Sequence, residues 1–340
     1  MEKFCLKDIY SRLGDDESRF LFEKRLNWSL TDDTSRLVSG INRESIHLKK
    51  ILNTSKELFL FGAGYGGHTI ANAYPQIPWR AFIDNDQNKV GKPDILPIIS
   101  FQEFIKKSEN ALVYITSLYS ECYTQIYQQL VSNGFPRSSI VSALFGNQYF
   151  DLPCFKPQKN EFFIDAGGHN GSTTKDFFQW LQNNNGEGGR SIVFEPNIDN
   201  CNICKNNLHK WDCHNVKIEN KGLWHKKETI KFHKEGFSSC IDSEGDDFIE
   251  TISLDEYLEN EKEPVTFIKM DIEGAELNAL KGAEKIIKEH KPKLAISIYH
   301  KPEDIWEIPD LLLNFVPDYK FYIRHYSIAW IETVLYAICD

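Results

Sequence analysis

A glycine-rich turn in the second half of the chain carries the clearest chemical signature. The stretch EFFIDAGGHNGSTT spans residues 161–174: an apolar run ends at Asp165, glycines follow at 167, 168 and 171, and hydroxyl residues open a helical pattern. Glycines let the backbone pass close to a ligand. An acid directly before such a turn would repel the pyrophosphate of a dinucleotide, but it suits a ligand with a cationic amino group. We call residues 165–171 the second glycine turn.

A second acid, Glu195, ends the next predicted strand, SIVFEP (residues 191–196). A carboxylate at this place can accept hydrogen bonds from ribose hydroxyls. An acid for an amino acid moiety and an acid for a ribose together indicate S-adenosylmethionine as the cofactor rather than NAD. The structural alternative is that Asp165 only caps a turn and that Glu195 only ends a strand.

Two later strand patterns end in residues that can handle a proton. TFIKMD ends at Asp271 and KLAISIYH ends at His300, and ligands of open α/β sheets lie beyond the carboxyl ends of strands. A hydroxyl that attacks a sulfonium methyl group must lose its proton, so we expect His300 to be the general base, with Asp271 and Glu273 beside it. Asp271 could also orient the histidine, anchor a sugar or bind a divalent metal; a metal is thus possible but not predicted.

Structural roles for these residues stay open. Glu273 and Glu276 are expected at the start of the following helix, where acids are favoured by the helix dipole. Lys269 lies inside a buried strand pattern and could be the ion-pair partner of Asp271. His300 could be a packed histidine at the end of its strand.

Several of these motifs together resemble the FkbM-type methyltransferases, which are class I S-adenosylmethionine-dependent enzymes that methylate hydroxyl groups. The resemblance runs from about Phe150 to the C-terminus through FFIDAGGHNGSTT, VFEPN, TISLDEYL and VTFIKMDIEGAELNALKGAEKIIKEHKPKLAISIYHKPEDIWEIP. It implies that Glu195 holds the cofactor's ribose and that Asn220 to Gly222 lie near its adenine. The residues that it implies for the cofactor's amino acid end are Asp165, Gly167, Gly168, Asn170 and Gly171.

A first glycine turn lies in LFLFGAGYGGHTIA, residues 58–71, between a strand pattern and a helix pattern. It has the complete Gly-x-Gly-x-x-Gly spacing through Gly62, Gly64 and Gly67, and Asp84 ends the next strand. The segment RAFIDNDQNKVG is similar to the nucleotide-sugar-binding domain of bacterial sugar acyltransferases, which implies that these four residues hold the nucleotide of an activated sugar. The alternative is a docking or dimerisation domain whose glycines only form a turn.

Strand and helix patterns alternate along most of the chain, which predicts an α/β protein with two Rossmann-like domains. We expect a helical segment over residues 1–50, a small Rossmann-like domain over 51–145 and a class I methyltransferase domain over 146–340, with a sheet of seven strands. The last two strand patterns, KFYIRHY and TVLYAI, are too close for a crossover helix, so the last strand must be antiparallel. A hairpin is expected between residues 228 and 254.

Composition narrows the function further. The net charge of −10 over 340 residues argues against nucleic-acid binding. No apolar stretch could span a membrane, and no signal peptide is recognisable, so we expect a cytoplasmic protein that does not insert into membranes. Eight cysteines are scattered in a chain without a recognisable export signal, so we expect reduced thiols. Zinc is not expected at Cys201, Cys204, Cys213 and His214, because a structural site would need a second close pair.

The predicted function is O-methylation of a sugar hydroxyl. The acceptor would be a small-molecule sugar, carried on a nucleotide or on a precursor of a surface glycan such as capsule or lipopolysaccharide, and a homodimer is an open possibility. The alternatives are an NAD-dependent oxidoreductase built on the first glycine turn and a non-catalytic nucleotide-sugar-binding protein.

Overall fold

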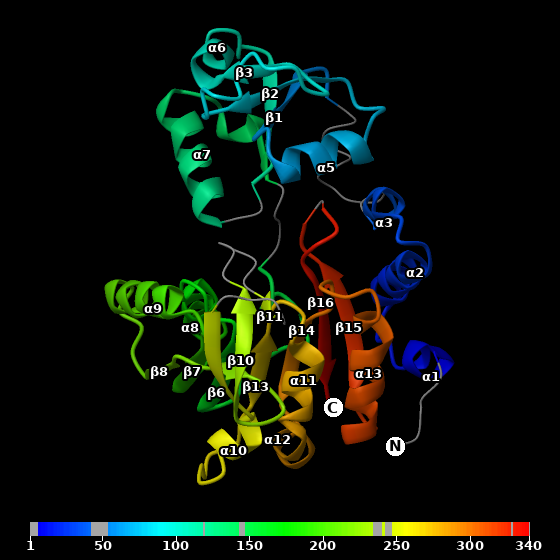
Figure 1. The fold of residues 1–340 in the computed structure, drawn as a ribbon, viewed down its shortest axis with the longest axis vertical. Coiled ribbons are helices and arrows are strands. Elements are labelled where there is room, and N and C mark those ends of the chain that lie inside the picture. The colour runs from blue at the N-terminus through cyan, green and yellow to red at the C-terminus, as the bar shows by residue number, and fades with distance from the viewer. Residues whose placement is uncertain are drawn as a thin grey trace. The chain divides into compact units, whose positions relative to one another are not determined.

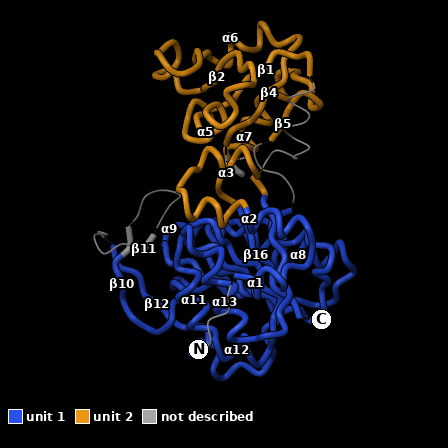
Figure 2. Tube along the Cα trace, turned by 90° about the vertical axis from the view of Figure 1, so that its right-hand side faces the viewer, with its two compact units in different colours: residues 1–23, 147–325, 333–340 blue, residues 24–146, 326–332 orange. Residues whose placement is uncertain are grey.

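The computed structural model describes residues 6–41, 54–117, 120–142, 147–233, 240–241, 247–327 and 329–339. The chain divides into two compact units (Figure 2). The larger unit comprises residues 1–23, 147–325 and 333–340, and the smaller unit comprises residues 24–146 and 326–332. The domain boundaries expected after residues 50 and 145 stay predictions.

The larger unit is built on a seven-stranded sheet with the order β15-β16-β14-β13-β6-β7-β8 (Figure 1). Strand β16 is antiparallel to both neighbours, and the other pairs are parallel. This confirms the predicted seven-stranded sheet with an antiparallel last strand. Its strands are β6 (Glu161–Ala166), β7 (Gly189–Phe194), β8 (Val216–Glu219), β13 (Phe267–Met270), β14 (Lys293–Ser297), β15 (Lys320–His325) and β16 (Thr333–Ile338).

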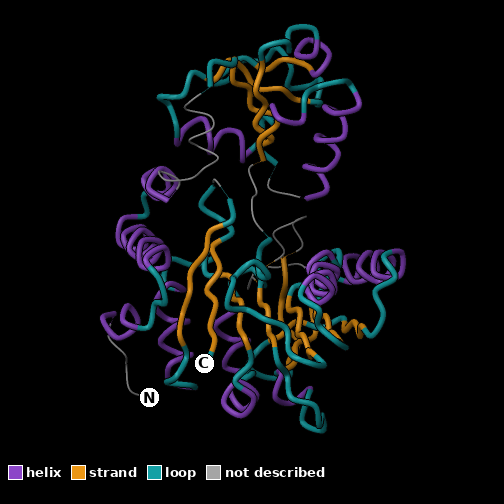
Figure 3. The backbone as a smooth tube through the Cα atoms, turned by 180° about the vertical axis from the view of Figure 1, so that it is seen from behind, coloured by secondary structure: helices purple, strands orange, loops and turns teal. Residues whose placement is uncertain are grey.

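The direction of strand order reverses between β6 and β13 in the middle of this sheet. There Lys269 lies opposite Asp165, and Met270 lies opposite Ala166. Helices flank the sheet (Figure 3), and the connections at the carboxyl ends of β6 and β13 therefore meet at one edge. The flanking helices that follow its strands are α8 (Ser172–Asn183), α9 (Ile198–Lys210), α11 (Glu276–Lys281), α12 (Glu284–His290) and α13 (Asp304–Phe315).

The helical pattern of AELNALKGAEKIIKEH, residues 275–290, predicts one helix, but this segment forms two. Helix α11 ends at Lys281 and α12 begins at Glu284. The carboxylate of Asp255, in α10 (Leu254–Tyr257), accepts hydrogen bonds from the backbone N–H groups of Lys285 and Ile286 at 2.9 and 3.0 Å. The second helix thus has its own N-terminal partner, which the helical periodicity alone could not indicate.

A small separate sheet lies in the larger unit, with the order β11-β10-β12-β9. The predicted hairpin between residues 228 and 254 is confirmed, because β10 and β12 pair antiparallel. The residues that join them lie partly outside the described ranges. The strands are β9 (Gly222–Leu223), β10 (Glu228–His233), β11 (Cys240–Ile241) and β12 (Asp247–Ile252).

The smaller unit holds a five-stranded parallel sheet with the order β3-β2-β1-β4-β5. Alternate residues of β1 pack into different buried clusters, so both faces of the sheet are covered. Strand β3 lies in GKPDILPIIS, residues 91–100, a pattern that predicts a loop, and β5 has no strand pattern in the sequence. Each strand has only three residues, too few to show a period. Its elements are β1 (Glu57–Phe61), α5 (Tyr65–Ala73), β2 (Trp79–Asp84), β3 (Ile98–Ser100), α6 (Phe101–Ile105), β4 (Ala111–Ile115), α7 (Ser120–Ser132) and β5 (Ile140–Ser142).

The N-terminal helical periodicity is confirmed over the described residues, as α1 (Leu6–Ser11), α2 (Asp16–Thr31) and α3 (Thr34–Ile41). The predicted segment also includes residues 42–50, which lie outside the description. Across the described ranges, no helix is both long enough and apolar enough to cross a membrane.

Candidate active site

The second glycine turn lies between the ends of two neighbouring strands. The backbone N–H groups of Gly167 and Gly168 donate to the carbonyl of Phe194, at 2.9 and 3.2 Å. Gly167 has a φ of +84°, and a Cβ on it would stand 1.9 Å from the carbonyl oxygen of Asp271. Glycine is therefore required at position 167 by the packing of the protein itself.

Asp165 lies beneath this turn. Its carboxylate accepts hydrogen bonds from Lys269 Nζ at 3.1 Å and from the Thr174 hydroxyl at 2.7 Å, and its side chain is fully buried. Lys269 Nζ also donates to the carbonyl oxygens of Ala166 and Gly167, at 3.0 and 2.8 Å. The alternative that Lys269 pairs with Asp271 is thus wrong, since the adjacent strand offers the nearer carboxylate. The direct contact between Asp165 and a cofactor stays a prediction.

Glu195 closes the turn from the end of β7. Its carboxylate accepts hydrogen bonds from the backbone N–H groups of His169 and Asn197, at 2.8 and 2.9 Å. Burial raises the pKa of this carboxyl group, although the two N–H donors act against the rise. The side-chain amide of Asn220 donates to the carbonyl oxygens of Glu195 and Pro196, both at 2.9 Å. The residues predicted for the ribose and for the adenine are therefore joined to one another.

The other predicted cofactor residues lie along the same edge. Asn170 is buried and accepts a hydrogen bond at Oδ1 from the backbone N–H of Ser172, at 3.0 Å, where α8 begins. Gly171 N–H donates to the carbonyl of Gly168 at 2.7 Å, which completes the turn. Gly222 begins β9 and pairs with Thr251 in β12.

The predicted catalytic residues come together at the ends of β13 and β14. Asp271 directly follows β13, and His300 lies beyond the end of β14 at Ser297. Glu273 does not begin the next helix as expected: it lies in the preceding turn with a φ of +54°, and α11 begins at Glu276. His300 is likewise not the last residue of its strand, because β14 stops three residues earlier.

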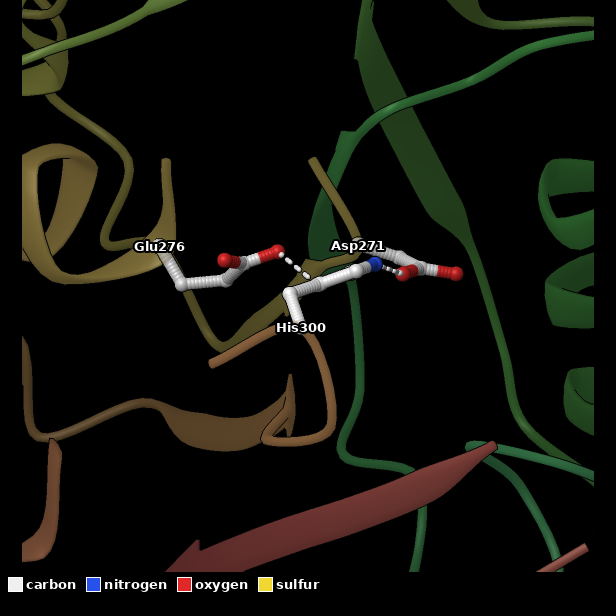
Figure 4. A group of neighbouring side chains, drawn as sticks. All are labelled: Asp271, Glu276 and His300. Atoms are coloured by element: carbon white, nitrogen blue, oxygen red, sulfur yellow. Dashed lines mark ion pairs between the residues drawn. The ribbon is translucent and has the colours of Figure 1, made fainter. Parts of the chain in front are cut away.

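His300 lies between carboxylates, as Figure 4 shows for Asp271 and Glu276. Its Nδ1 is 2.9 Å from Glu276 Oε1, and its Nε2 is 3.5 Å from both Asp271 Oδ1 and Glu273 Oε2. These are ion-pair distances, but neither ring nitrogen has a partner with hydrogen-bond angles among the described residues. We call Asp271, Glu273, Glu276 and His300 the carboxylate–histidine cluster.

The cluster perturbs the pKa of Asp271, Glu273 and His300. Burial lowers the pKa of His300, but attraction to Glu276, Asp271 and Glu273 outweighs this and raises the pKa to about 10. Burial raises the pKa of Glu273 to about 7, against the attraction of His300. Burial also acts to raise the pKa of Asp271, but His300 and Lys269 lower it overall. The imidazole of this arrangement therefore holds a proton at neutral pH, and a base role for His300 requires that the surrounding charge change.

Two tyrosines that hold Asp271 were not found from the sequence. The Tyr149 hydroxyl donates to Asp271 Oδ2 at 2.9 Å, and the Tyr299 hydroxyl donates to Asp271 Oδ1 at 3.1 Å. Tyr299 directly precedes the predicted His300, so its place beside the site had a local signal. Tyr149 lies 122 residues from Asp271, in a segment that reads as a connector, and had none. Glu276 was seen as an acid but not as the partner of His300.

The first glycine turn, in the smaller unit, is closed by its own acid. Asp84 Oδ2 accepts a hydrogen bond from the backbone N–H of Ala63, and Oδ1 accepts one from that of Asp86, both at 2.9 Å. Gly62 and Gly67 lie on either side of Gly64, where a Cβ would meet no atom within 4 Å. The four predicted nucleotide residues thus share one turn, and Gly64 is open.

One region of the larger unit matches a known protein family. Residues 165–323 match the family model described as the methyltransferase FkbM domain. Over these residues the chain is similar to a methyltransferase FkbM domain. This match covers the second glycine turn, Glu195 and the carboxylate–histidine cluster. A comparison with curated proteins finds no match.

Comparison with solved structures finds a match with a TM-score above 0.5. The crystal structure of methyltransferase FkbM from Methylobacillus flagellatus is 20% identical, with a TM-score of 0.51, and the match covers 91% of this chain and all of that one. Weaker similarity extends to a precorrin-6y C5,15-methyltransferase from Geobacter metallireducens, 11% identical with a TM-score of 0.36 over 56% of this chain and 84% of that one. An O-methyltransferase from Bacillus cereus in complex with SAH is 16% identical, with a TM-score of 0.34 over 52% and 74%. The first of these supports a methyltransferase fold for the chain.

Proposed function

We propose that the protein is an S-adenosylmethionine-dependent O-methyltransferase that acts on a hydroxyl group of a sugar. One observation carries the proposal: the glycine turn closed by Glu195 and the carboxylate–histidine cluster lie beyond adjacent strands, where strand order reverses. Ligands of open α/β sheets bind at this position. A cofactor side and a proton-handling side thus meet at one place.

The cofactor would lie across the second glycine turn. Glu195 would accept hydrogen bonds from the ribose, with Asn220 and Gly222 near the adenine, and Gly167, Gly168, Asn170 and Gly171 near the amino acid end. Asp165 would support the turn without contacting the cofactor, because its carboxylate already accepts hydrogen bonds from Lys269 and Thr174. Its role is then to fix the turn rather than to touch the cofactor.

The transfer itself needs an oxygen nucleophile and a place for its proton. The acceptor oxygen forms a bond to the methyl carbon while the carbon–sulfur bond breaks, and its electron pair returns to sulfur, leaving S-adenosylhomocysteine. The hydroxyl proton leaves as the new bond forms. In this proposal the hydroxyl lies beside Asp271, Glu273 and His300, and the carboxylates would also orient neighbouring sugar hydroxyls. His300 would be the base only in a state in which the imidazole is neutral.

Both Asp84 oxygens accept backbone hydrogen bonds, as both Glu195 oxygens do at the second turn, so this acid does not separate a dinucleotide site from a nucleotide-sugar site. We propose that the first glycine turn holds the nucleotide of an activated sugar, at the open position beside Gly64. A cytoplasmic location and a surface-glycan precursor as substrate belong to the same proposal.

The test measures cofactor binding and turnover separately. Titration calorimetry should detect binding of S-adenosylhomocysteine and none of NADH. Mass spectrometry of nucleotide-linked sugars incubated with S-adenosylmethionine should then show a gain of one methyl group. Binding of NADH without S-adenosylhomocysteine would favour the oxidoreductase, and S-adenosylhomocysteine binding without turnover of any nucleotide-linked or glycan acceptor would favour the non-catalytic alternative.

A further inference from the structure

His300 Nε2 faces the carboxylates of Asp271 and Glu273 across a gap. No described side chain makes a hydrogen bond to Nε2 there. Nε2 lies 3.5 Å from Asp271 Oδ1 and 3.5 Å from Glu273 Oε2. The His300 side chain is 9% exposed, whereas those of Asp271 and Glu273 are 24% and 37% exposed. The gap is thus buried on the histidine side and accessible on the carboxylate side.

The buried nitrogen that faces this gap has no hydrogen-bond partner. His300 Nε2 makes no hydrogen bond to a described residue, whereas Nδ1, on the other side of the ring, lies 2.9 Å from Glu276 Oε1. The His300 side chain is 9% exposed, so water reaches Nε2 poorly. Buried polar groups in folded proteins are nearly always satisfied, so a buried nitrogen without a hydrogen bond indicates a missing ligand. Since three of the four residues are acids, that ligand should be a cation.

The spacing fits a divalent metal ion. Metal–nitrogen and metal–oxygen bonds to such ions are about 2.0–2.2 Å long, so two ligands in tetrahedral arrangement stand about 3.4 Å apart. The Nε2–oxygen distances of 3.5 Å are close to this value. Asp271, Glu276 and His300 bring one potential ligand atom each within 4.8 Å of one another. Glu273 is not in that group, and its place at the gap rests on the 3.5 Å between its Oε2 and His300 Nε2.

The surroundings hold these groups in place for such a role. Glu276 Oε1 lies 2.9 Å from His300 Nδ1, which is where a carboxylate orients a metal-binding histidine. The hydroxyl groups of Tyr149 and Tyr299 fix the Asp271 carboxylate. Glu273 reaches the gap from the left-handed turn before α11.

We propose that His300 Nε2, Asp271 Oδ1 and Glu273 Oε2 bind a divalent transition-metal cation, with Glu276 holding the other ring nitrogen. A nitrogen ligand favours ions such as Mn²⁺ and Zn²⁺ over Mg²⁺ and Ca²⁺, which prefer oxygen alone. Three protein ligands leave a position open to a substrate oxygen.

The cation would deepen the proposed function, and only its catalytic role rests on that function. An acceptor hydroxyl bound at the open position would be a stronger acid, so its proton could pass to water as the oxygen–methyl bond forms. In this state His300 serves as a ligand rather than as the base. The binding of the cation can be tested without any substrate.

The experiment titrates Mn²⁺ alone into the full-length protein after treatment with a chelator and removal of the chelator. Free Mn²⁺ is followed by electron paramagnetic resonance. We expect a single Mn²⁺ bound per chain, displaced by Zn²⁺ at lower concentration than by Mg²⁺. Asp271→Asn and Glu273→Gln should each abolish this binding, and Glu276→Gln should weaken it about 10–100-fold. Glu284→Gln is the matched control, because Glu284 lies on α12 in an exposed pair with Lys288 and should leave affinity unchanged.

Two outcomes would overturn the cation site: no Mn²⁺ bound at millimolar concentration, or equal affinity in the wild type and the Glu273→Gln variant. Glu273 lies in a turn and is partly exposed, so this variant keeps the test valid if Asp271→Asn fails to fold. S-adenosylhomocysteine binding is measured on the same chelated protein. Retained binding without Mn²⁺ uptake rejects the cation alone, whereas Mn²⁺ uptake without S-adenosylhomocysteine binding rejects the proposed function alone.

Discussion

The two glycine turns share one construction. In each, a strand of a parallel sheet leads into a glycine with positive φ, Gly62 in the smaller unit and Gly167 in the larger. In each, an acid from the end of the next strand accepts a hydrogen bond from a backbone N–H of the turn: Asp84 from Ala63 at 2.9 Å, and Glu195 from His169 at 2.8 Å. A helix then begins. The glycine spacing and the acid alone therefore do not separate a cofactor site from a structural turn.

The turns differ in what the neighbouring strand supplies. Beside the second turn, β13 contributes the buried Lys269 and then Asp271, which leads into the carboxylate–histidine cluster. Beside the first turn, β4 is followed by Thr116, whose hydroxyl donates to the carbonyl of Phe61 at 2.8 Å. The residues after the adjacent strand, rather than the glycines, therefore separate the proposed reacting site from the proposed binding turn.

The largest expected effect tests the buried lysine of the second turn. Lys269→Met should destabilise the larger unit by about 3–5 kcal/mol, because it leaves the fully buried Asp165 carboxylate without its counter-charge. Hydrogen exchange of the β6 and β13 amides, followed by mass spectrometry, measures the loss. The matched change at the first turn is Lys89→Met: Lys89 lies 3.3 Å from Asp84 but is 42% exposed, so the cost should stay under about 1 kcal/mol.

The double variant Asp165→Asn with Lys269→Met is the control for this comparison. It removes both charges, so it should recover part of the stability that the single variant loses. Equal costs for Lys269→Met and Lys89→Met would show that the two turns are held by equivalent ion pairs, contrary to our interpretation.

The second prediction separates the glycines of the first turn. Gly67→Ala should destabilise the smaller unit by about 1–3 kcal/mol, because its Cβ would stand 2.1 Å from the carbonyl oxygen of Gly62 and the backbone must shift. Gly64→Ala should cost less than about 1 kcal/mol, because its Cβ meets no atom within 4 Å and its φ is −117°. Urea unfolding of both variants gives the measurement. A larger cost for Gly64→Ala than for Gly67→Ala would contradict the observed packing.

Much of the fold follows from local patterns in the sequence. The antiparallel pairing of the last two strands was predictable because residues 326–332 are too few for a crossover helix. The two glycine turns were predictable from the glycine spacing after apolar runs. Short edge strands did not follow, because β3 and β5 show too few residues for a period. The single predicted helix over 275–290 failed because Asp255, twenty or more residues earlier, supplies the partner that starts α12.

The sequence predicted which residues lie near one another at the candidate site, but not which side chains pair. The proximity of Asp271 and His300 was predictable because the carboxyl ends of parallel strands meet at one edge of a sheet. Lys269 pairs with Asp165 rather than Asp271 because of the register between β13 and β6. The two residues are 104 positions apart, and the hydrophobic pattern of each strand does not predict how the two strands align. The left-handed turn at Glu273 also has no signal in the sequence, because a non-glycine residue with positive φ is set by its surroundings.

The third prediction tests whether the first turn binds a nucleotide. Gly64→Ala adds a methyl group at the one open glycine, so it should weaken binding of a nucleoside diphosphate about tenfold or more while the fold is kept. Calorimetry with a panel of nucleoside diphosphates identifies the base and gives the affinity. S-adenosylhomocysteine affinity should not change, since that ligand would use the second turn. Undiminished nucleotide binding would support the docking alternative for this turn or place the nucleotide elsewhere.

The smallest expected effect concerns the acid that closes the second turn. Burial raises the pKa of Glu195, so the folded chain holds this proton more tightly than the unfolded chain does. Stability from this group is therefore present at pH values below its ordinary pKa and is lost as the pH rises through the folded-state pKa. Glu195→Gln cannot ionise and also loses one of the two backbone hydrogen bonds. The variant should have a lower free energy of unfolding than the wild type. This difference should shrink between pH 4 and pH 7, by about 1.4 kcal/mol for each unit by which the pKa of Glu195 differs between the folded and unfolded chain. Urea unfolding of both proteins at several pH values measures the difference. A difference that grows over this range would mean that the two N–H donors outweigh burial, and that Glu195 is ready in its charged form to bind a ribose.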